Sequence, residues 1–377
     1  MNVLILTNSL IGVYNFRLEF VQRLTADGDT VTVAAPEDAD PAALQTIGAR
    51  FAATPFQLHG KNPAADIRLM RTYRRLINET NADIVYTYTI KPNIYGGLAA
   101  QSARVPYVAT ITGLGTAVAA KGPMQTLTVN LYRRALKHAQ TVYFQNTENR
   151  DFFMKNRIID QRIRLTAGSG VNTEHFAALP YPADASVTRF LFLGRVMEEK
   201  GIRQYLEAAK TITARHPETE FHVVGGGETA ERIALKRFET AGVITYHGET
   251  DDIRPYLETA HCTVHPTMYP EGMSNVLLES AASARPLIAT DRAGCREIID
   301  AETTGYLVTP ADSESLSAAI EQFLALSRAE QTAMGRAGRA KVVREFDRRA
   351  VVEQYAAERS EVYEPAAVPA EKLRVGR

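Results

Sequence analysis

The chain has 377 residues, of which 45% are hydrophobic and 23% are charged. This composition excludes a disordered or fibrous protein, and the length predicts two domains, because one core rarely serves more than about 250–300 residues. The net charge of zero is unevenly spread: residues 1–180 carry 19 basic and 13 acidic side chains, so the second half is acidic. A basic first half favours an anionic partner.

Short valine- and isoleucine-rich runs alternate with helical patterns along the whole chain, which is typical of parallel βαβ units. We expect strands at 3–6, 30–36, 82–88, 106–112, 141–146 and 162–168, then, after the two-proline segment 179–186, at 188–195, 220–227, 243–249, 262–267 and 286–290. The sequence therefore predicts an α/β protein with two Rossmann-like, doubly wound domains facing each other across a cleft. Residues 1–178 and 187–345 form these domains, and a helix within 346–363 packs back on the first.

The lack of a recognisable signal peptide and the small number of cysteines favour a cytoplasmic setting. The first apolar run has no basic segment before it and no small-residue cleavage site, so we expect a strand rather than a signal peptide. No window is apolar over the roughly 18–20 residues that a membrane span needs. Two cysteines are too few for a disulfide framework and favour a reducing compartment.

Ligands of doubly wound sheets bind beyond the carboxyl ends of the strands, so the loops that follow strands are the place to look for chemistry. Arg195 and Lys200 follow the first strand of the second half. Two cations at such a place suit a diphosphate, although the pair on its own fits solvated surface charges equally well.

The next loop contains Gly225, Gly226 and Gly227, which would let the backbone approach a ligand closely. It also matches the dinucleotide fingerprint G-x-G-x-x-A, with Glu249 about 20 residues on, so an NAD-dependent oxidoreductase is an alternative. Such a fingerprint usually opens its domain, whereas this loop follows a second strand. The loop 246–252 around Gly248 offers backbone groups that suit a base edge, or is a plain connection.

The segment 269–279, "YPEGMSNVLLE", combines a loop, small residues and the start of an apolar helix. Unpaired amides at a helix N-terminus bind anions, and small residues let a phosphate reach them. Glu279, about a turn and a half into the helix, suits a ribose diol, and Glu271 would reach another part of the same ligand. A capping role for Ser274 is compatible with both a ligand site and a plain helix start.

The order and spacing of these motifs resemble the retaining glycosyltransferases of family 4, which have the GT-B fold. Glu271 and Glu279 correspond to the E-x7-E pair of that family, and "GSGVNTEHF" at 168–176 is similar to its domain junction. The element "GR…EKG" supplies Gly194, Arg195, Glu199, Lys200 and Gly201.

The resemblance implies a role for each of these positions. Arg195, Lys200 and Glu271 would be catalytic, with the two cations on the leaving diphosphate and Glu271 on the sugar hydroxyls. Glu279 would bind the ribose of a UDP-sugar. The full donor-binding set is Gly12, Gly194, Gly225, Gly248, Glu249, Gly272, Met273, Ser274, Asn275, Val276 and Glu279. No cofactor or metal is implied, since only "TDD" at 250–252 approaches a metal motif.

The first half resembles a bacterial subgroup that extends undecaprenyl-diphosphate-linked saccharides, through "YNFR" (14–17), "YTIKPNIYGGLAA" (88–100) and "TITGLG" (110–115). Thr112 replaces a histidine that contacts the transferred sugar in many members, and Gly12 stands where many have a Gly-Gly pair. Lys91 either meets an acceptor phosphate or is solvated. The expected acceptor-side residues are Asn15, Arg17, Lys91, Asn93, Thr112 and Gly113.

Two basic stretches, 67–77 and 131–139, interleave arginine and lysine with apolar residues. Such helices lie on anionic lipid or are domain helices with a solvated face. The segment 260–266 contains His261, Cys262 and His265. Alternation along a strand separates the cysteine from the histidines, so we expect a sheet core rather than zinc.

We therefore predict a retaining glycosyltransferase that moves a hexose or N-acetylhexosamine from a UDP-sugar to a lipid-linked saccharide. It would work at the cytoplasmic face of the inner membrane and bind no nucleic acid. A same-face mechanism is favoured because the sequence offers no clear carboxylate nucleophile. The alternatives are a UDP-sugar epimerase of the same fold, an NAD-dependent oxidoreductase and a catalytically silent nucleotide-sugar binder.

Overall fold

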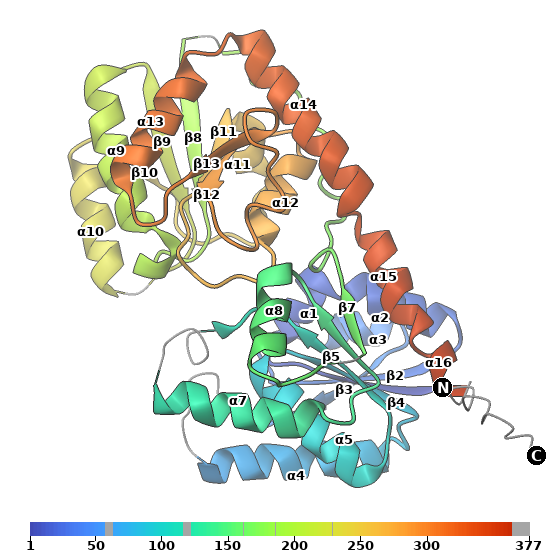
Figure 1. Ribbon diagram of the computed structural model, residues 1–377. Coiled ribbons are helices and arrows are strands. Elements are labelled where there is room, and N and C mark those ends of the chain that lie inside the picture. The colour runs from blue at the N-terminus through green and yellow to red at the C-terminus, as the bar shows by residue number, and fades with distance from the viewer. Residues whose placement is uncertain (57–62, 116–121, 161, 185, 228, 364–377) are drawn as a thin grey trace, which may run out of the picture.

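Two domains built on separate parallel sheets lie one above the other (Figure 1), which confirms the predicted α/β class and two-domain arrangement. The computed structural model describes residues 1–56, 63–115, 122–160, 162–184, 186–227 and 229–363. Within these ranges, no helix combines the length and the hydropathy that crossing a membrane requires.

The N-terminal sheet has seven parallel strands in the order β3-β2-β1-β4-β5-β6-β7. Its central strands are buried along their whole length because helices cover both faces. The strands are β1 (Asn2–Leu6), β2 (Thr30–Ala35), β3 (Arg50–Ala53), β4 (Ile84–Tyr88), β5 (Tyr107–Ile111), β6 (Thr141–Phe144) and β7 (Ile163–Leu165). The helices are α1 (Leu10–Phe16), α2 (Leu18–Ala26), α3 (Ala42–Thr46), α4 (Pro63–Glu79), the π-helical η1 (Pro92–Gly96), α5 (Gly97–Ala103), α7 (Pro123–Leu136) and α8 (Thr147–Lys155).

The C-terminal sheet has six parallel strands in the order β10-β9-β8-β11-β12-β13. They are β8 (Thr188–Leu193), β9 (Thr219–Val224), β10 (Thr245–Tyr246), β11 (Cys262–His265), β12 (Leu287–Thr290) and β13 (Gly305–Val308). The helices from here to the end of the described chain are the 3-10 turn η2 (Glu198–Lys200), α9 (Ile202–Arg215), α10 (Thr229–Thr240), α11 (Arg254–Thr259), α12 (Asn275–Ala282), α13 (Ser313–Leu324), α14 (Arg328–Glu345), α15 (Arg348–Ala357) and α16 (Ser360–Tyr363).

Two edge strands are absent from the sequence prediction. β3 and β13 have four residues each, and both include partly exposed positions. An edge strand pairs on one side only and gains less burial, so its apolar pattern is weaker. The predictions for the other strands lie on observed strands, although only two residues of the expected strand 243–249 pair.

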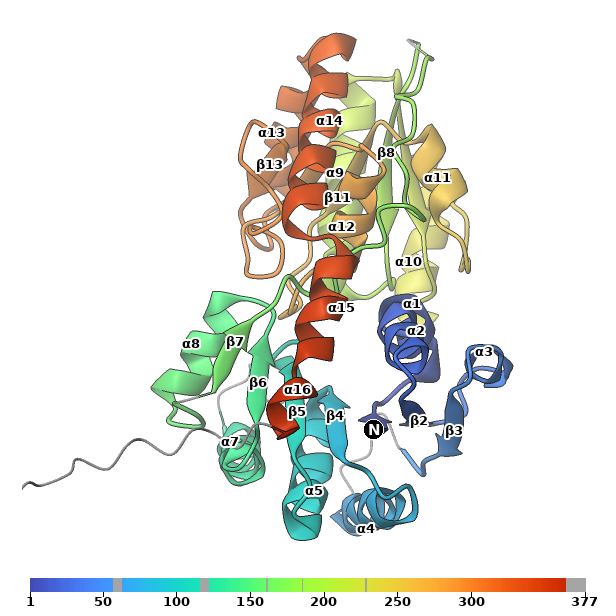
Figure 2. The same cartoon turned by 90° about the vertical axis from the view of Figure 1, so that its right-hand side faces the viewer.

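The chain crosses between the domains twice, once between β7 and β8 and again between α14 and α15. After α14, which covers the C-terminal domain, α15 descends onto the N-terminal domain and packs against α2 (Figures 1 and 2). Tyr355 of α15 is buried in the N-terminal core with Phe20 and Tyr86. The last helices therefore belong to the hydrophobic core of the first domain.

Candidate active site

The loop between β11 and α12, residues 269–274, carries Glu271 and is called the carboxylate loop below. Ser274 is the N-cap of α12, and its Oγ accepts a hydrogen bond from the N–H of Leu277 at 3.5 Å. The N–H of Ser274 donates to the carbonyl oxygen of Gly294 at 2.8 Å. The end of the loop that leads into α12 is thereby fixed. The first amides of this helix have no partner within it, as in anion-binding helix N-termini.

Lys200 and Glu271 form an ion pair, although 71 residues separate them in sequence. Their side chains keep only 14% and 16% exposure. Both cations of the "GR…EKG" element also stand over the ring of Tyr269, with Lys200 Nζ at 5.1 Å and Arg195 Cζ at 5.9 Å from its centroid. The structure thus gathers the three predicted catalytic side chains at the carboxyl edge of one sheet.

Glycines allow the loops at this edge to approach one another. Gly201 has a φ of 77°, and a Cβ there would overlap the carbonyl oxygen of Pro266. A Cβ at Gly225, whose φ is 143°, would overlap the carbonyl oxygen of Gly194. The N–H of Gly225 donates to the carbonyl oxygen of Gly248 at 2.7 Å. The three glycine loops after β8, β9 and β10 therefore pack on one another, which accounts for the glycine run without a dinucleotide.

The remaining predicted donor residues lie around these loops. Glu249 is exposed, and its carboxylate lies beside the backbone of Gly226. Gly272 and Met273 are buried in the carboxylate loop, whereas Asn275 and Val276 in the first turn of α12 are partly exposed. The exposed part of this turn is the part that a ligand can reach.

The two glutamates of the E-x7-E pair have opposite pKa shifts. Burial raises the pKa of Glu271, but His265 and Lys200 more than reverse this and hold it at about 2. Burial raises the pKa of Glu279 to about 7, and the charge of Arg348 only partly opposes it. Glu271 is therefore a carboxylate at neutral pH, whereas Glu279 titrates in this range.

Glu279 lines a cavity of about 490 Å³ between the two domains. Its other walls come from α1, from the linker residues 172–176, from the loop 250–253 and from Arg348 at the start of α15. Asn15, a predicted acceptor-side residue, is exposed in the same wall. A partly buried carboxylate in a cavity of this size suits a bound nucleoside.

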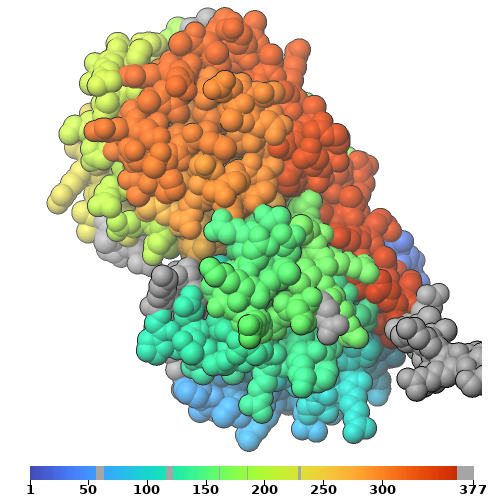
Figure 3. All heavy atoms as spheres, viewed as in Figure 1, coloured from blue at the N-terminus to red at the C-terminus, as the bar shows by residue number. Residues whose placement is uncertain are grey.

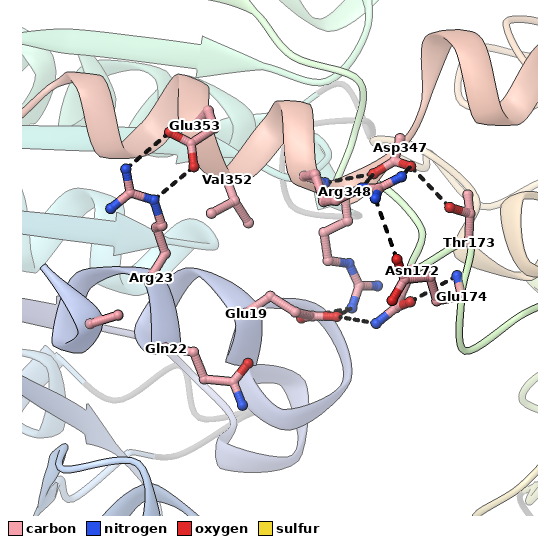
Figure 4. Close-up of a pocket in the computed structure, with 12 residues that line it drawn as sticks. Glu19, Gln22, Arg23, Asn172, Thr173, Glu174, Asp347, Arg348, Val352 and Glu353 are labelled. Carbon is pink, nitrogen blue, oxygen red and sulfur yellow. Dashed lines mark hydrogen bonds and ion pairs between the residues drawn. The ribbon is translucent and has the colours of Figure 1, made fainter.

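Arg348 lines this cavity and also the neighbouring pocket that Figure 4 shows. Its Nη1 lies 2.9 and 3.0 Å from the two carboxylate oxygens of Glu19 in α2. Its Nε and Nη2 donate to the carbonyl oxygen of Gly170 at 3.3 and 3.2 Å. Asn172 donates to the same carboxylate at 3.0 Å. The charge beside Glu279 is therefore held by α2 and by the segment between β7 and β8.

The N-terminal domain holds the carboxylate loop directly. Asn146, the buried N-cap of α8, donates from Nδ2 to the carbonyl oxygens of Gly272 at 2.6 Å and of Glu271 at 3.3 Å. Asn149 also donates to Glu271 O, at 3.4 Å. The backbone of Gly272 packs against the carbonyl oxygen of Thr112, so a Cβ would overlap it. Figure 3 shows the surfaces of the two domains in contact in this region.

Thr112 and Gly113, predicted on the acceptor side, therefore border the carboxylate loop. A Cβ at Gly113, with a φ of 142°, would come within 2.9 Å of the carbonyl oxygen of Pro270. These two residues follow β5, so the end of that strand contacts the backbone of the carboxylate loop in the other domain.

Two residues near β1 have other partners. Gly12 lies in the first turn of α1, and its N–H donates to Oγ of the N-cap Ser9 at 2.9 Å, so this amide is not free for a donor phosphate. Arg17 is 7% exposed and stands over the ring of Tyr88 at 4.5 Å. A buried guanidinium stacked on a ring stabilises the junction of α1 and α2 and does not reach an acceptor surface.

Two predicted acceptor-side residues follow β4. Lys91 forms an ion pair with Asp66 of α4 at 3.0 Å. Asn93 is 1% exposed, and its amide is used inside the domain: Oδ1 accepts from Thr87 at 2.7 Å and Nδ2 donates to Thr110 O at 2.8 Å. Asn93 therefore holds η1 against the sheet and does not present its side chain to an acceptor.

Sequence reasoning did not single out Asn146 or Arg348, and it assigned His265 only to the sheet core. Asn146 stands two residues after the end of β6. This position at the carboxyl end of a strand is the signal by which the sequence could have identified it. Nothing local marks Arg348, because its role depends on two crossings that meet only in the folded chain. Across the described ranges, His, Cys, Asp and Glu side chains nowhere gather in a set of three that could hold a metal ion.

Both domains match families of known proteins. The model "Glycosyl transferase 4-like" matches residues 3–146, and "Glycosyl transferases group 1" matches residues 187–325. An N-acetylgalactosaminyltransferase of Campylobacter jejuni, named for N,N'-diacetylbacillosaminyl-diphospho-undecaprenol, is 24% identical over 86% of this chain and 89% of its own. An Escherichia coli α-1,3-galactosyltransferase named for UDP-Gal and α-D-GlcNAc-diphosphoundecaprenol is 24% identical over 66% and 68%.

Solved structures share the fold over nearly the whole chain. A glycosyltransferase from Rickettsia africae has a TM-score of 0.79 at 19% identity, covering 97% of this chain and 99% of that one. Anabaena HepE in complex with UDP and glucose has a TM-score of 0.77 at 17% identity, covering 96% and 99%. With a glycosyltransferase model matching each domain and the GT-B fold throughout, the chain belongs to the family 4 glycosyltransferases.

Proposed function

We propose that this glycosyltransferase takes its sugar from a UDP-sugar, and the observation that carries the proposal is the Glu271–Lys200 pair. Lys200 and Arg195 supply positive charge to the leaving diphosphate, and Glu271 accepts hydrogen bonds from the sugar hydroxyls. The helix that follows the carboxylate loop carries Glu279 into the cavity between the domains, where it meets the ribose. The UDP-bound neighbour supports this choice of nucleotide.

The transfer retains the configuration of the anomeric carbon. The bond from this carbon to the diphosphate oxygen breaks, and the acceptor oxygen forms its bond on the same face. The acceptor hydroxyl proton passes to the departing diphosphate. Glu271, the carboxylate nearest the cations, is already engaged with Lys200, which favours this course over a covalent intermediate. Proton NMR of the product reports the anomeric configuration, and an inverted linkage would contradict this mechanism.

The acceptor in this proposal is a saccharide linked to undecaprenyl diphosphate. The two relatives with that lipid in their names support it, and one of them covers most of this chain. Thr112 and Gly113 border the acceptor hydroxyl, next to the carboxylate loop. Lys91, whose ammonium is balanced by Asp66, meets the acceptor diphosphate.

A lipid-linked acceptor places the enzyme at the cytoplasmic face of the inner membrane. α4 and α7 lie at the base of the N-terminal domain, and α5 packs against both (Figures 1 and 2). Ile67 of α4 is 47% exposed, and Met124 and Leu127 of α7 are 42% and 54% exposed. Exposed arginines accompany them on both helices, a combination that suits an anionic lipid surface.

A panel of UDP-sugars with a synthetic undecaprenyl-diphosphate-linked monosaccharide, analysed by mass spectrometry, tests the reaction. Extension of the acceptor by one hexose or N-acetylhexosamine is expected. Conversion of a UDP-sugar to its epimer in the absence of acceptor would instead identify an epimerase. Thermal shifts with UDP but not with NAD are expected, because ligands that bind the native state stabilise it.

Sedimentation with anionic vesicles tests membrane docking. Leu127→Asp is expected to lower the vesicle-bound fraction, because a charge replaces an exposed apolar contact. Ile233→Asp is the matched control, since Ile233 of α10 is 55% exposed in the other domain. Binding of the unchanged protein should fall as salt rises. An equal effect of the two substitutions would contradict docking through α7.

A further inference from the structure

His265 is a buried histidine at the end of β11, next to the carboxylate loop. Its side chain is 1% exposed, and neither ring nitrogen has a hydrogen-bond partner among the described residues. Buried polar groups are almost always hydrogen-bonded, so an imidazole with two unpaired nitrogens costs stability. Such a cost at the edge of a catalytic loop points to a partner that arrives in another state of the site.

The imidazole faces the catalytic carboxylate. Nε2 of His265 lies 3.9 Å from Oε1 of Glu271, and Lys200 pairs with the same oxygen. The carboxylate thus stands between a cation that holds it and an imidazole just beyond hydrogen-bond distance. A displacement of about 1 Å would close the gap to an ordinary hydrogen bond.

Donor binding supplies a reason for that displacement. A diphosphate carries more negative charge than one carboxylate, and it competes for the ammonium of Lys200. Once Lys200 turns to the phosphate, the buried carboxylate of Glu271 loses its principal counter-charge. A buried carboxylate without a donor is costly, so the neighbouring imidazole N–H becomes its favoured partner.

We propose that His265 is the positioning residue of Glu271: when the donor diphosphate engages Lys200, a hydrogen bond from His265 Nε2 takes over the carboxylate and orients its free oxygen toward the sugar. This inference rests on the proposed contact between Glu271 and the donor sugar. It also gives the buried histidine a function that a place in the sheet core does not supply.

The two ring nitrogens permit a sharp test. Glutamine places its amide nitrogen close to the position of Nε2, whereas asparagine reaches only the position of Nδ1. Both substitutions keep a polar side chain of smaller or similar size in the same strand. His265→Gln therefore keeps the proposed hydrogen bond, and His265→Asn loses it. His261, which is also fully buried in this segment, provides the matched control His261→Asn.

The measurement is isothermal titration with UDP and with UDP-glucose, UDP-galactose and their N-acetylated forms. For the sugar nucleotide that binds tightest, His265→Asn is expected to lower the affinity by about tenfold or more while the affinity for UDP alone changes by less than about twofold. His265→Gln and His261→Asn should stay within about threefold of the unchanged protein for both ligands. Thermal melting establishes that each variant is folded.

Three outcomes would overturn the inference. One is an unchanged sugar-nucleotide affinity in His265→Asn, and a second is an equal loss in His265→Gln. The third is an equal loss for UDP and the sugar nucleotide, because a merely structural histidine would not distinguish them. Glu271→Gln tests the proposed contact between Glu271 and the donor sugar by itself. If this variant binds the sugar nucleotide as the unchanged protein does, the proposed role of Glu271 fails too. If only that variant loses affinity, the role of Glu271 stands and His265 has none.

Discussion

Replacing Glu279 by glutamine should stabilise the protein at alkaline pH, because the structure raises the pKa of this carboxyl from 4.5 to about 7. Below pH 4.5 the carboxyl is protonated in both the folded and the unfolded chain and has no effect on their balance. Between pH 4.5 and 7 the unfolded chain releases the proton and the folded chain keeps it, so stability falls as pH rises. Above pH 7 the loss is complete.

The two pKa values set the size of this loss. Their difference corresponds to about 3 kcal/mol, an upper value for a side chain that keeps some contact with solvent. Glutamine does not titrate and avoids the loss. The free energy of unfolding of Glu279→Gln relative to the unchanged protein should therefore rise by about 1–3 kcal/mol between pH 5 and pH 8.

Thermal melting at pH 5 and pH 8 measures the effect. A domain of this size gains roughly 2–4 °C in Tm for each kcal/mol, so the advantage of Glu279→Gln should be several degrees larger at pH 8. Glu207→Gln, on the exposed face of α9, is the control for loss of one negative charge. The same Tm difference at both pH values would refute the burial argument. The affinity for UDP should fall in Glu279→Gln, because the carboxylate is proposed to meet the ribose.

Four further substitutions test the site. Arg195→Ala and Lys200→Ala should each lower kcat by about a hundredfold or more, and near-normal turnover would contradict their proposed role on the diphosphate. Asn146→Asp keeps the N-cap of α8 but loses the amide donor to the carboxylate loop. It should lower kcat by about tenfold in steady-state assays, and an unchanged kcat would show that this contact is dispensable. Gly201→Ala should lower Tm more than Gly28→Ala, because both have positive φ but only the first lacks space for a Cβ.

The sequence predicts the architecture and the gathering of Lys200 and Glu271 for one physical reason. Parallel strands end at a common edge, so side chains just beyond two neighbouring strands meet even when they are far apart in sequence. β8 and β11 are such neighbours, and they bring Lys200 to Glu271. Alternation along a strand likewise predicts that His261 and His265 are buried.

The strand order does not predict whether a side chain at this edge bonds within its own domain or to the other domain. Asn93 follows β4 at the expected edge, yet its amide is used within its own domain, because η1 turns the side chain toward β5. Asn146 follows β6 at the same edge and crosses to the other domain. The strand order predicts the same edge of the sheet for both residues. Only the path of the backbone after each strand decides whether the side chain bonds within its own domain or to the other domain.

The contacts of the carboxylate loop tie Glu271 to both domains. Asn146 and Asn149 of α8 hold the carbonyl oxygens of Glu271 and Gly272, while the side chain of Glu271 is held by Lys200 of its own domain. Backbone and side chain of one residue are thus fixed by different domains. A rotation between the domains must break the contacts with α8 or move Glu271 relative to Lys200. The full set of contacts around Glu271 is therefore kept only at the angle between the domains that the structure has.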